Sequence, residues 1–212
     1  MRFLITAGPT REYLDDVRFL SNASSGRMGY ALARAAARRG HRTVLVSGPA
    51  SLPAPAGVKL VRVTSAQEMY RECAKHFAQC DCLIGAAAPA DYTPVRRHRG
   101  KMKKKEGGLS IEVKPTVDIL GTLGARKRKG RILIAFALEV QAPLKNALDK
   151  MRRKNADAVL LNSPAAINAR RADARILLST GKRLLLKNAS KESIARTLVR
   201  LAEELHASAE IA

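Results

Sequence analysis

The chain has 212 residues, of which 46% are apolar, 4% are aromatic and none is tryptophan, so we expect one domain with an aliphatic core. Its formal net charge of +21 favours an acidic partner such as a nucleotide, a phosphorylated substrate, a nucleic acid or an anionic membrane. The chain lacks any apolar run of ~18 residues, and its first strand-like run is too short for a signal peptide, so we expect a soluble, cytoplasmic protein without a membrane role.

Strand-like and helical segments alternate along the chain. The predicted strands are residues 2–7, 42–47, 58–63, 82–87, 131–137, 157–161, 174–179 and 182–187. The predicted helices are residues 25–39, 66–78, 117–126, 143–154 and 191–206. Continuously apolar strands between helices are typical of a mostly parallel sheet covered on both faces, and the turn Ser179-Thr180-Gly181-Lys182 predicts a small antiparallel β annex. Residues 1–212 are therefore expected to form a single α/β domain.

The three cysteines suit a reducing compartment. The spacing of Cys80 and Cys82 does not fit a CxxC redox or zinc motif, and Cys73 has no nearby partner, so we expect inert, buried thiols. The four histidines are scattered, and no metal site is predicted.

The clearest functional signal is the stretch 5–29, ITAGPTREYLDDVRFLSNASSGRMG. It begins as a strand, breaks at Gly8-Pro9 and reaches a helix after a long polar loop. Strand-to-helix loops commonly have ~2–6 residues, so a loop of this length is expected to have a function. It is not the GxGxxG fingerprint, in which the glycines directly follow the strand.

The end of this stretch predicts a phosphate site at Ser24, Ser25 and Gly26, because a helix N-terminus attracts anions. Simple N-capping by a serine is the alternative. In the loop before it, Arg18 can clamp a phosphate or carboxylate, and Asn22 can stabilise negative charge that develops on an acyl oxygen. A surface charge and an Asx-turn are the corresponding structural alternatives.

These motifs resemble the phosphopantothenate–cysteine ligases, in the pattern ITAGPTRE…DxVRxxSNxSSGxMG. Later motifs agree in order and spacing, so the resemblance covers nearly all of the chain. It implies a Rossmann-like fold and the joining of 4'-phosphopantothenate to cysteine, through an acyl-nucleotide, in coenzyme A biosynthesis. It also implies CTP or ATP as co-substrate with Mg²⁺, no flavin, and a homodimer whose sites are completed across the interface. In the family, the counterpart of Asn22 is essential for turnover of the acyl-nucleotide, and that of Arg18 contacts the substrate.

The segment GAAAPADY, residues 85–92, places small residues at the carboxyl end of a predicted strand, where open α/β sheets bind ligands. It resembles the family's AAVADY segment, which implies nucleotide-binding roles for Gly85, Ala86, Ala87 and Asp91. A turn or cap is the alternative role for Asp91. Pro89 replaces the usual valine and removes one backbone N–H.

Residues 92–108 lack apolar periodicity and are rich in lysine and arginine, which predicts a mobile basic flap. A solvated surface, a nucleic-acid patch and a lid over a triphosphate all fit such a run of charge. The resemblance to the family's KxKK flap, ten residues after the aspartate of the ADY segment, implies that Lys101 contacts nucleotide phosphates and serves the first half-reaction.

Three later segments extend the implied nucleotide site. VKPTVDIL resembles the family's LxKTPDIL, with N-capping by Thr116 as the alternative. IAFALE resembles GFAAET, and its phenylalanine is otherwise an ordinary core residue. Two lysines one helical turn apart precede a segment resembling KGxDxIVAND and are otherwise exposed helix lysines. The residues implied to bind nucleotide are Val117, Asp118, Ile119, Leu120, Phe136, Lys150 and Lys154.

Two other functions compete with a ligase. An NAD(P)-dependent reductase would need a glycine fingerprint after the first strand and an acid at the end of the second, and neither is present. A nucleic-acid-binding protein fits the charge, but the few aromatic residues and the absence of a binding motif oppose it. The family's frequent flavin decarboxylase domain has no counterpart in these residues, so we expect ligation only, with a separate decarboxylase as a possible partner.

Overall fold

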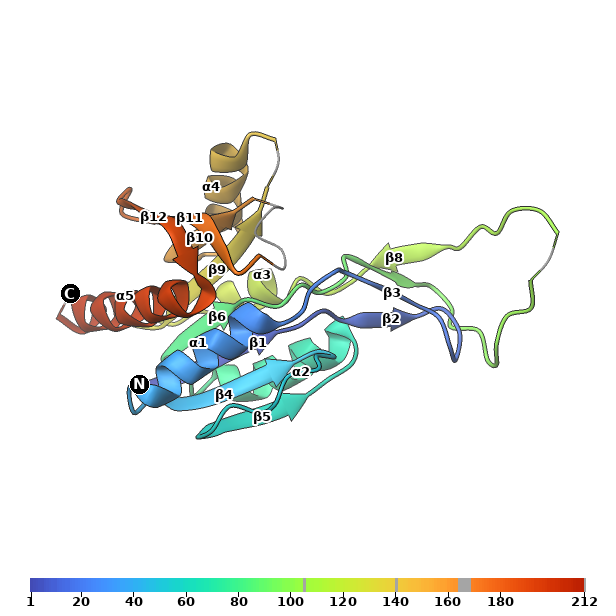
Figure 1. Ribbon diagram of the computed structural model, residues 1–212, viewed down its shortest axis with the longest axis horizontal. Helices are drawn as coiled ribbons and strands as arrows, with labels where there is room; N and C mark the ends of the chain where they lie inside the picture. Colours follow the sequence, from blue (N-terminus) through green and yellow to red (C-terminus); the bar gives the residue numbers. More distant parts are fainter. Residues whose placement is uncertain (105, 140, 164–168, 212) are drawn as a thin grey trace.

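The computed structural model describes residues 1–104, 106–139, 141–163 and 169–211. Its centre is an eight-stranded sheet in the order β12-β11-β10-β9-β6-β1-β4-β5 (Figure 1). The strands are β1 (Arg2–Ala7), β4 (Arg42–Ser47), β5 (Val58–Arg62), β6 (Cys82–Gly85), β9 (Ile132–Leu138), β10 (Ala158–Asn162), β11 (Arg171–Leu178) and β12 (Arg183–Ser190).

Along this sheet, the six neighbouring strands β5, β4, β1, β6, β9 and β10 pair in parallel. Strand β11 pairs antiparallel with β10, and β12 pairs antiparallel with β11. The predicted annex is therefore the edge of the main sheet rather than a separate layer. The α/β fold with its mostly parallel sheet is confirmed.

Helices cover both faces of the sheet. The helices α1 (Arg27–Arg38) and α5 (Lys191–Ile211) pack on one face, and α2 (Ala66–Phe77), α3 (Ile119–Gly124) and α4 (Pro143–Arg153) pack on the other. Strand β1 shows why both faces are apolar: Phe3 and Ile5 point into the α1–α5 core, and Leu4 points into the α2–α4 core. Successive side chains of a strand face opposite sides, so a central strand must be apolar throughout.

The three cysteines are free and buried in these cores, as expected. Burial raises the pKa of the Cys73 and Cys80 thiols to about 12, so neither forms a thiolate at neutral pH.

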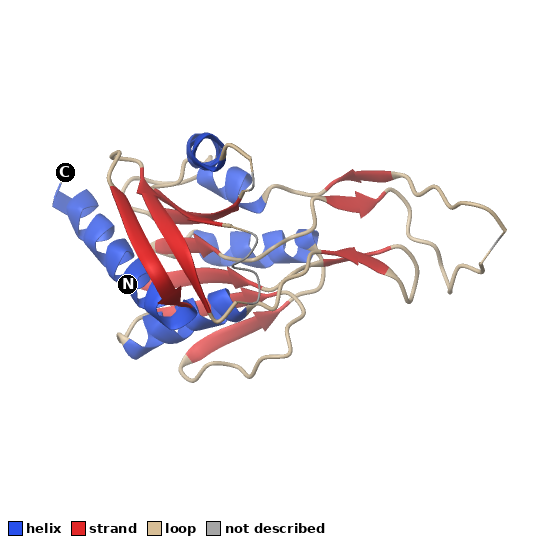
Figure 2. Cartoon of the chain, turned by 45° about the horizontal axis from the view of Figure 1, so that its top comes forward, coloured by secondary structure: helices blue, strands red, loops and turns tan. Residues whose placement is uncertain are grey.

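Two hairpins extend beyond the sheet and were not predicted. The strands β2 (Arg11–Tyr13) and β3 (Phe19–Ser21) form one, and β7 (Tyr92–Pro94) and β8 (Val113–Pro115) form the other. Together with their loops they make an arm, residues 10–21, 92–104 and 106–115, that projects away from the helices (Figures 1 and 2). Strands of three residues leave little periodicity to read, and those of the arm are mostly exposed or half-buried.

The predicted flap at 92–108 is corrected accordingly. Its first residues form β7, and the loop it belongs to runs on to β8. Cation–π contacts help to hold the arm together: Arg11 lies 4.5 Å from the ring centroid of Phe19, and Arg97 lies 5.1 Å from that of Tyr13.

Candidate functional site

A cavity of about 790 Å³ opens where β6, β9 and β10 end and α1 begins. This is the edge at which open α/β sheets usually bind ligands. Most of the residues proposed from the sequence line it: Asn22, Ser24, Ser25, Gly26, Gly85, Ala86, Ala87, Asp91, Val117, Asp118, Ile119, Leu120, Phe136, Lys150 and Lys154. Segments far apart in the sequence therefore form one site.

The wall at the start of α1 is built from backbone. The N-cap is Gly26, in the left-handed conformation at φ 74°, and no side chain caps the helix. Capping by a serine, the alternative interpretation, is therefore wrong. The Gly26 N–H donates weakly to Ser24 Oγ at 3.4 Å, and Arg27 adds a positive charge to the wall. Such a helix start suits a phosphate group.

Hydrogen bonds join the loop after β6 to the end of β1 and to the loop that follows β1. The Ala87 N–H donates to Thr6 Oγ1 at 3.1 Å, and the Ala90 N–H donates to Thr10 Oγ1 at 2.9 Å. Both threonines are buried, so these bonds fix the shape of the cavity floor. Asp91 is exposed at the rim, and its carbonyl accepts the Thr116 N–H.

Asn22 also lines the cavity and is bonded to that same floor. Its Nδ2 donates to the Pro89 carbonyl at 2.8 Å and, at 3.4 Å, to the Ala88 carbonyl. The side-chain amide therefore faces the 85–91 loop, and its oxygen, Oδ1, has no hydrogen-bond partner among the described residues. An Asx-turn, the alternative interpretation, is not among its contacts.

The opposite wall carries the two lysines. Lys150 Nζ donates to the Phe136 carbonyl at 3.1 Å, and burial together with the nearby Lys154 lowers the pKa of Lys150. Lys154 Nζ lies 2.6 Å from Asp118 Oδ1, and 14% of its side chain is exposed. Neither lysine is the freely exposed helix residue of the alternative interpretation.

Asp118, rather than Thr116, caps α3. Its side chain accepts the Gly121 N–H at 2.9 Å, while Thr116 Oγ1 donates to the Ala90 carbonyl at 2.6 Å. N-capping by Thr116 was therefore wrong. Although burial opposes it, the pKa of Asp118 is lowered by Lys154 and the cap bond, so Asp118 stays ionised and orients Lys154.

Sequence reasoning missed several residues of this cavity. Asn162, at the end of β10, has a buried Oδ1 without a hydrogen-bond partner among the described residues. A buried acceptor without a partner is costly, so a ligand N–H would satisfy it. Its position at the carboxyl end of a parallel strand was the available signal. The other missed lining side chains that carry charge are Arg27, Glu139, Arg153 and Lys191.

Arg18 and Lys101 do not line the cavity; both lie on the arm. The Arg18 guanidinium donates to the Met102 carbonyl at 3.1 Å and lies 3.7 Å from Asp15. The structure of one chain therefore does not bring these two predicted residues together with Asn22.

Two aspartates clasp the loop that carries Lys101. The buried Asp15 accepts the Arg18 N–H at 2.6 Å and the Met102 N–H at 3.1 Å. Asp16 accepts the Gly100 N–H at 2.7 Å. The residues on either side of Lys101 are thus anchored to the β2–β3 hairpin. Hydrogen bonds from backbone N–H groups lower the pKa of both aspartates, with Arg18 the largest influence on Asp15 and Gly100 on Asp16.

Among the described residues, no three His, Cys, Asp or Glu side chains converge as a metal site would require. A search of the same residues for helices with the length and hydropathy of a membrane span finds none.

Comparison with known proteins identifies the family of the chain. Residues 1–205 match the family described as DNA/pantothenate metabolism flavoprotein C-terminal domain. The coenzyme A biosynthesis bifunctional protein CoaBC of Bacillus subtilis is 46% identical over 167 residues, which are 78% of this chain and 41% of that protein. Its Haemophilus influenzae counterpart is 37% identical over 201 residues, 95% of this chain and 49% of that protein. The chain thus spans less than half the length of these two relatives.

Solved structures support the same family and fold. The crystal structure of the C-terminal domain of CoaBC superposes with a TM-score of 0.85 at 38% identity, covering 98% of this chain and 96% of that one. A Cab2 mutant in complex with phosphopantothenate-cysteine shares the fold, with a TM-score of 0.81 at 16% identity over 99% of this chain and 88% of that one. The resemblance seen in the sequence is confirmed, and the chain belongs to the DNA/pantothenate metabolism flavoprotein C-terminal domain family.

Proposed function

We propose that the protein is a phosphopantothenate–cysteine ligase that uses a nucleotide, preferably CTP, to activate its acyl substrate. The observation that carries the proposal is the cavity itself. It has a helix N-terminus suited to a phosphate on one wall and the partly buried Lys150 and Lys154 on the other. Asn22 lies between them, on the floor.

The chemistry demands charge neutralisation more than a nucleophile. A carboxylate oxygen of phosphopantothenate attacks the α-phosphorus, and the bond from phosphorus to pyrophosphate breaks, which yields an acyl-nucleotide. The cysteine amine then attacks the acyl carbon, loses a proton, and expels the nucleotide monophosphate. Both steps gain from positioning and from fixed positive groups around the developing charge.

The phosphate of phosphopantothenate binds at Ser24, Ser25 and Gly26. The nucleotide lies between the 85–91 loop and α4, with its phosphates near Lys150 and Lys154 and its magnesium ion carried in as part of the substrate. The unsatisfied Oδ1 of Asn162 suits an N–H donor of the ligand, such as an exocyclic amino group of the base. Both cytosine and adenine carry such a group.

The nucleotide can be identified by thermal shift. Any ligand that binds only the folded state stabilises it by RT ln(1 + [L]/Kd), about 2.7 kcal/mol at ~100 times Kd. CTP with magnesium is expected to raise the melting temperature more than ATP does. A shift with NADPH alone would instead support the reductase.

Asn22 acts on the acyl group. Its amide turns from the Pro89 carbonyl toward the acyl oxygen when the intermediate forms, and there it stabilises negative charge on that oxygen. This exchange replaces one hydrogen bond by another, so the rotation leaves no amide N–H unpaired.

Arg18 and Lys101 serve the site of a second copy of this chain. The arm carries them away from its own cavity, and most of the large exposed apolar side chains of the described residues lie on it: Val17, Phe19, Tyr92, Leu109, Ile111 and Val113. Exposed apolar surface of this kind marks an interaction site. A two-fold dimer that covers the arm would bring these residues to the partner's cavity.

The decisive experiment measures pyrophosphate release and product by mass spectrometry. With phosphopantothenate and CTP but no cysteine, we expect a single burst of pyrophosphate and a bound acyl-cytidylate. Adding cysteine is expected to start steady turnover and release CMP. The absence of pyrophosphate release with both CTP and ATP would refute the proposal.

A further inference from the structure

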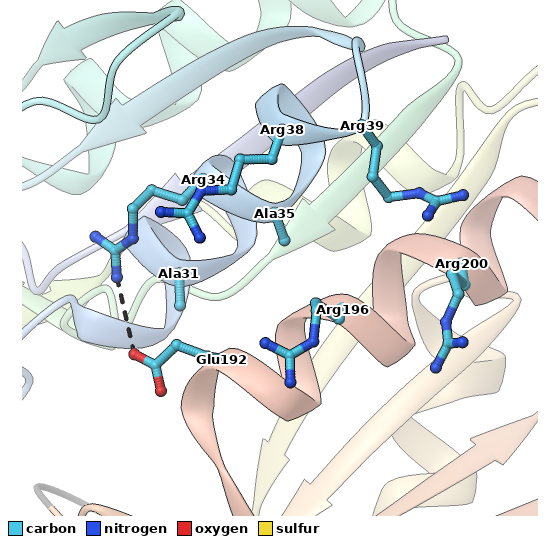
Figure 3. A pocket seen from close by; sticks show the side chains of 8 residues that line it. All are labelled: Ala31, Arg34, Ala35, Arg38, Arg39, Glu192, Arg196 and Arg200. Carbon is cyan, nitrogen blue, oxygen red and sulfur yellow. Dashed lines mark ion pairs between the residues drawn. The ribbon is translucent and has the colours of Figure 1, made fainter.

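A second cavity, of about 250 Å³, lies between α1 and α5, on the helices that cover one face of the sheet. Its floor is formed by the buried Ala31 and Ala35 of α1. Its walls are arginines from both helices: Arg34, Arg38, Arg39, Arg196 and Arg200 (Figure 3). Glu192 is the one acidic residue among the described residues of its lining. We call this cavity the arginine groove.

Helical spacing creates the two rows of charge. Arg34 and Arg38 are one turn apart on α1, and Arg196 and Arg200 are one turn apart on α5, so each pair projects on one side of its helix. Like charges at this spacing destabilise an isolated helix. Two such rows facing one groove concentrate positive potential there, beyond what the net charge alone requires.

Most of this charge is not neutralised by the protein. Arg39 pairs with Glu203 at 2.7 Å, and Arg34 lies 4.0 Å from Glu192. The side chains of Arg38, Arg196 and Arg200 have no ion pair or hydrogen bond within the described part of the chain. Three guanidinium groups thus remain available to an anion, and guanidinium groups bind phosphate oxygens in pairs of parallel hydrogen bonds.

The carboxylates around the groove limit the length of that anion. Glu192 lies at one end, and Glu203 holds Arg39 at the other. A polymer of phosphates continuing past one end would meet the carboxylate of Glu192, whose side chain is 61% exposed, and past the other end the Arg39 charge is already paired with Glu203. None of the described residues that line the groove is aromatic, so bases have no ring to stack on there. Pockets for drug-sized ligands measure ~300–1,000 Å³, so the smaller groove suits a compact anion.

We propose that the arginine groove is a binding site for a compact polyphosphate anion, of the size of inorganic pyrophosphate, that bridges α1 and α5. The site is separate from the functional cavity and does not depend on the reaction proposed for it. Both helices nevertheless begin at that cavity, through Arg27 and Lys191. An anion that joins the helices would therefore also fix the spacing of two of its walls.

Inorganic pyrophosphate is the probe, measured by calorimetric titration. Because the functional cavity can also hold it, the titrations use the Lys150→Gln/Lys154→Gln protein as background. Adding Arg196→Gln/Arg200→Gln is expected to weaken binding about 100-fold, since two charge-assisted bonds are lost. The control adds Arg62→Gln/Arg71→Gln, which removes the same charge from exposed positions on β5 and α2.

An equal loss of affinity in the groove variant and the control would overturn the proposal, because it would show that only net charge matters. So would an absence of pyrophosphate binding to the background protein. Tighter binding of a long oligonucleotide than of pyrophosphate, abolished by the groove substitutions, would assign the groove to nucleic acid instead. If Arg196→Gln/Arg200→Gln fails to fold by circular dichroism, Arg38→Gln/Arg196→Gln makes the same test across the two helices.

Discussion

The functional cavity and the arm differ in what holds their residues in place. Around the cavity, buried strands and helix starts fix each wall. The side chains of Thr6 and Thr10, which are at most 3% exposed, accept hydrogen bonds that hold its loops together. On the arm, short strands and carboxylate bonds hold the backbone, while Val17 and Leu109 leave 57% and 67% of their surface exposed. The described lining of the cavity comes from one chain, whereas the arm exposes apolar surface of the kind that marks an interaction site.

This comparison divides the proposed reaction between two chains. One copy would supply the phosphate-binding helix start, the lysines and Asn22, and the other would supply Arg18 and Lys101.

The largest effect is expected for Asn22→Asp. A carboxylate in place of the amide would repel the negative charge on the acyl oxygen instead of stabilising it. Removing one such donor typically costs ~100–1,000-fold in rate. Quenched-flow analysis is expected to show normal pyrophosphate release and accumulated acyl-nucleotide. Product formation at the rate of the unaltered protein would exclude Asn22 from the mechanism.

Lys101→Gln is expected to slow the first half-reaction by ~10–100-fold, which corresponds to one lost charge-assisted bond. Lys103→Gln, on the same loop and equally exposed, is the matched control and is expected to have little effect. If both substitutions slow pyrophosphate release equally, the loop contributes only its overall positive electrostatic potential, and Lys101 makes no specific contact with the nucleotide.

Mixing two impaired variants tests the division between chains. Random exchange of Asn22→Asp and Lys101→Gln protomers makes half of the dimers mixed, each with one intact site. About a quarter of the full activity is therefore expected to return if a two-fold dimer shares its sites. Activity that stays at the level of the separate variants would place Lys101 at the cavity of its own chain and contradict the proposed role of the arm.

The cavity was largely predictable from the sequence, and the arm was not. Ser24 to Gly26 and Asp91 were found because they lie at a helix start and after a strand end, which leave signals in the chain. The roles of Phe136 and Lys150 were implied by the family resemblance alone. Asp118 was implied as a ligand contact, but its role as cap and as partner of Lys154 depends on contacts between α3 and α4. Such long-range pairs leave no local pattern.

The arm escaped prediction for a different reason. Its strands are three residues long, and the carboxylates that organise it bond to loops more than eighty residues away. Asp15 and Asp16 therefore look like ordinary loop residues in the sequence. The placement of Arg18 and Lys101 outside their own cavity follows from those same bonds.

A pH titration of nucleotide binding sharpens the assignment of Lys150. Its pKa is lowered by burial and by Lys154, so it loses its proton at a lower pH than an ordinary lysine. Only the protonated form attracts phosphate. Affinity for the nucleotide, measured by calorimetry, is therefore expected to fall as pH rises toward the pKa of Lys150. In Lys150→Gln the affinity is weaker at neutral pH, and this alkaline decline disappears. An unchanged decline would assign it to another group.

The smallest effect is expected from neutralising Asp15, the carboxylate that anchors the loop of the arm, and it concerns local stability. Its pKa is lowered in the folded state by backbone N–H groups, chiefly that of Arg18, so its stabilising contribution is complete above the ordinary aspartate pKa. That contribution is lost as pH falls through the lowered value. The protection factors of the Met102 and Arg18 amides, which allow for the slower intrinsic exchange in acid, are expected to fall as pH drops for this reason. Asp15→Asn, which keeps an acceptor but removes the charge, is expected to show faster exchange already at neutral pH, while the amides of β1 stay protected. Faster exchange throughout the central sheet would mean that Asp15 supports the whole domain. The proposed difference between a cavity held by the sheet and an arm held by local bonds would then be refuted.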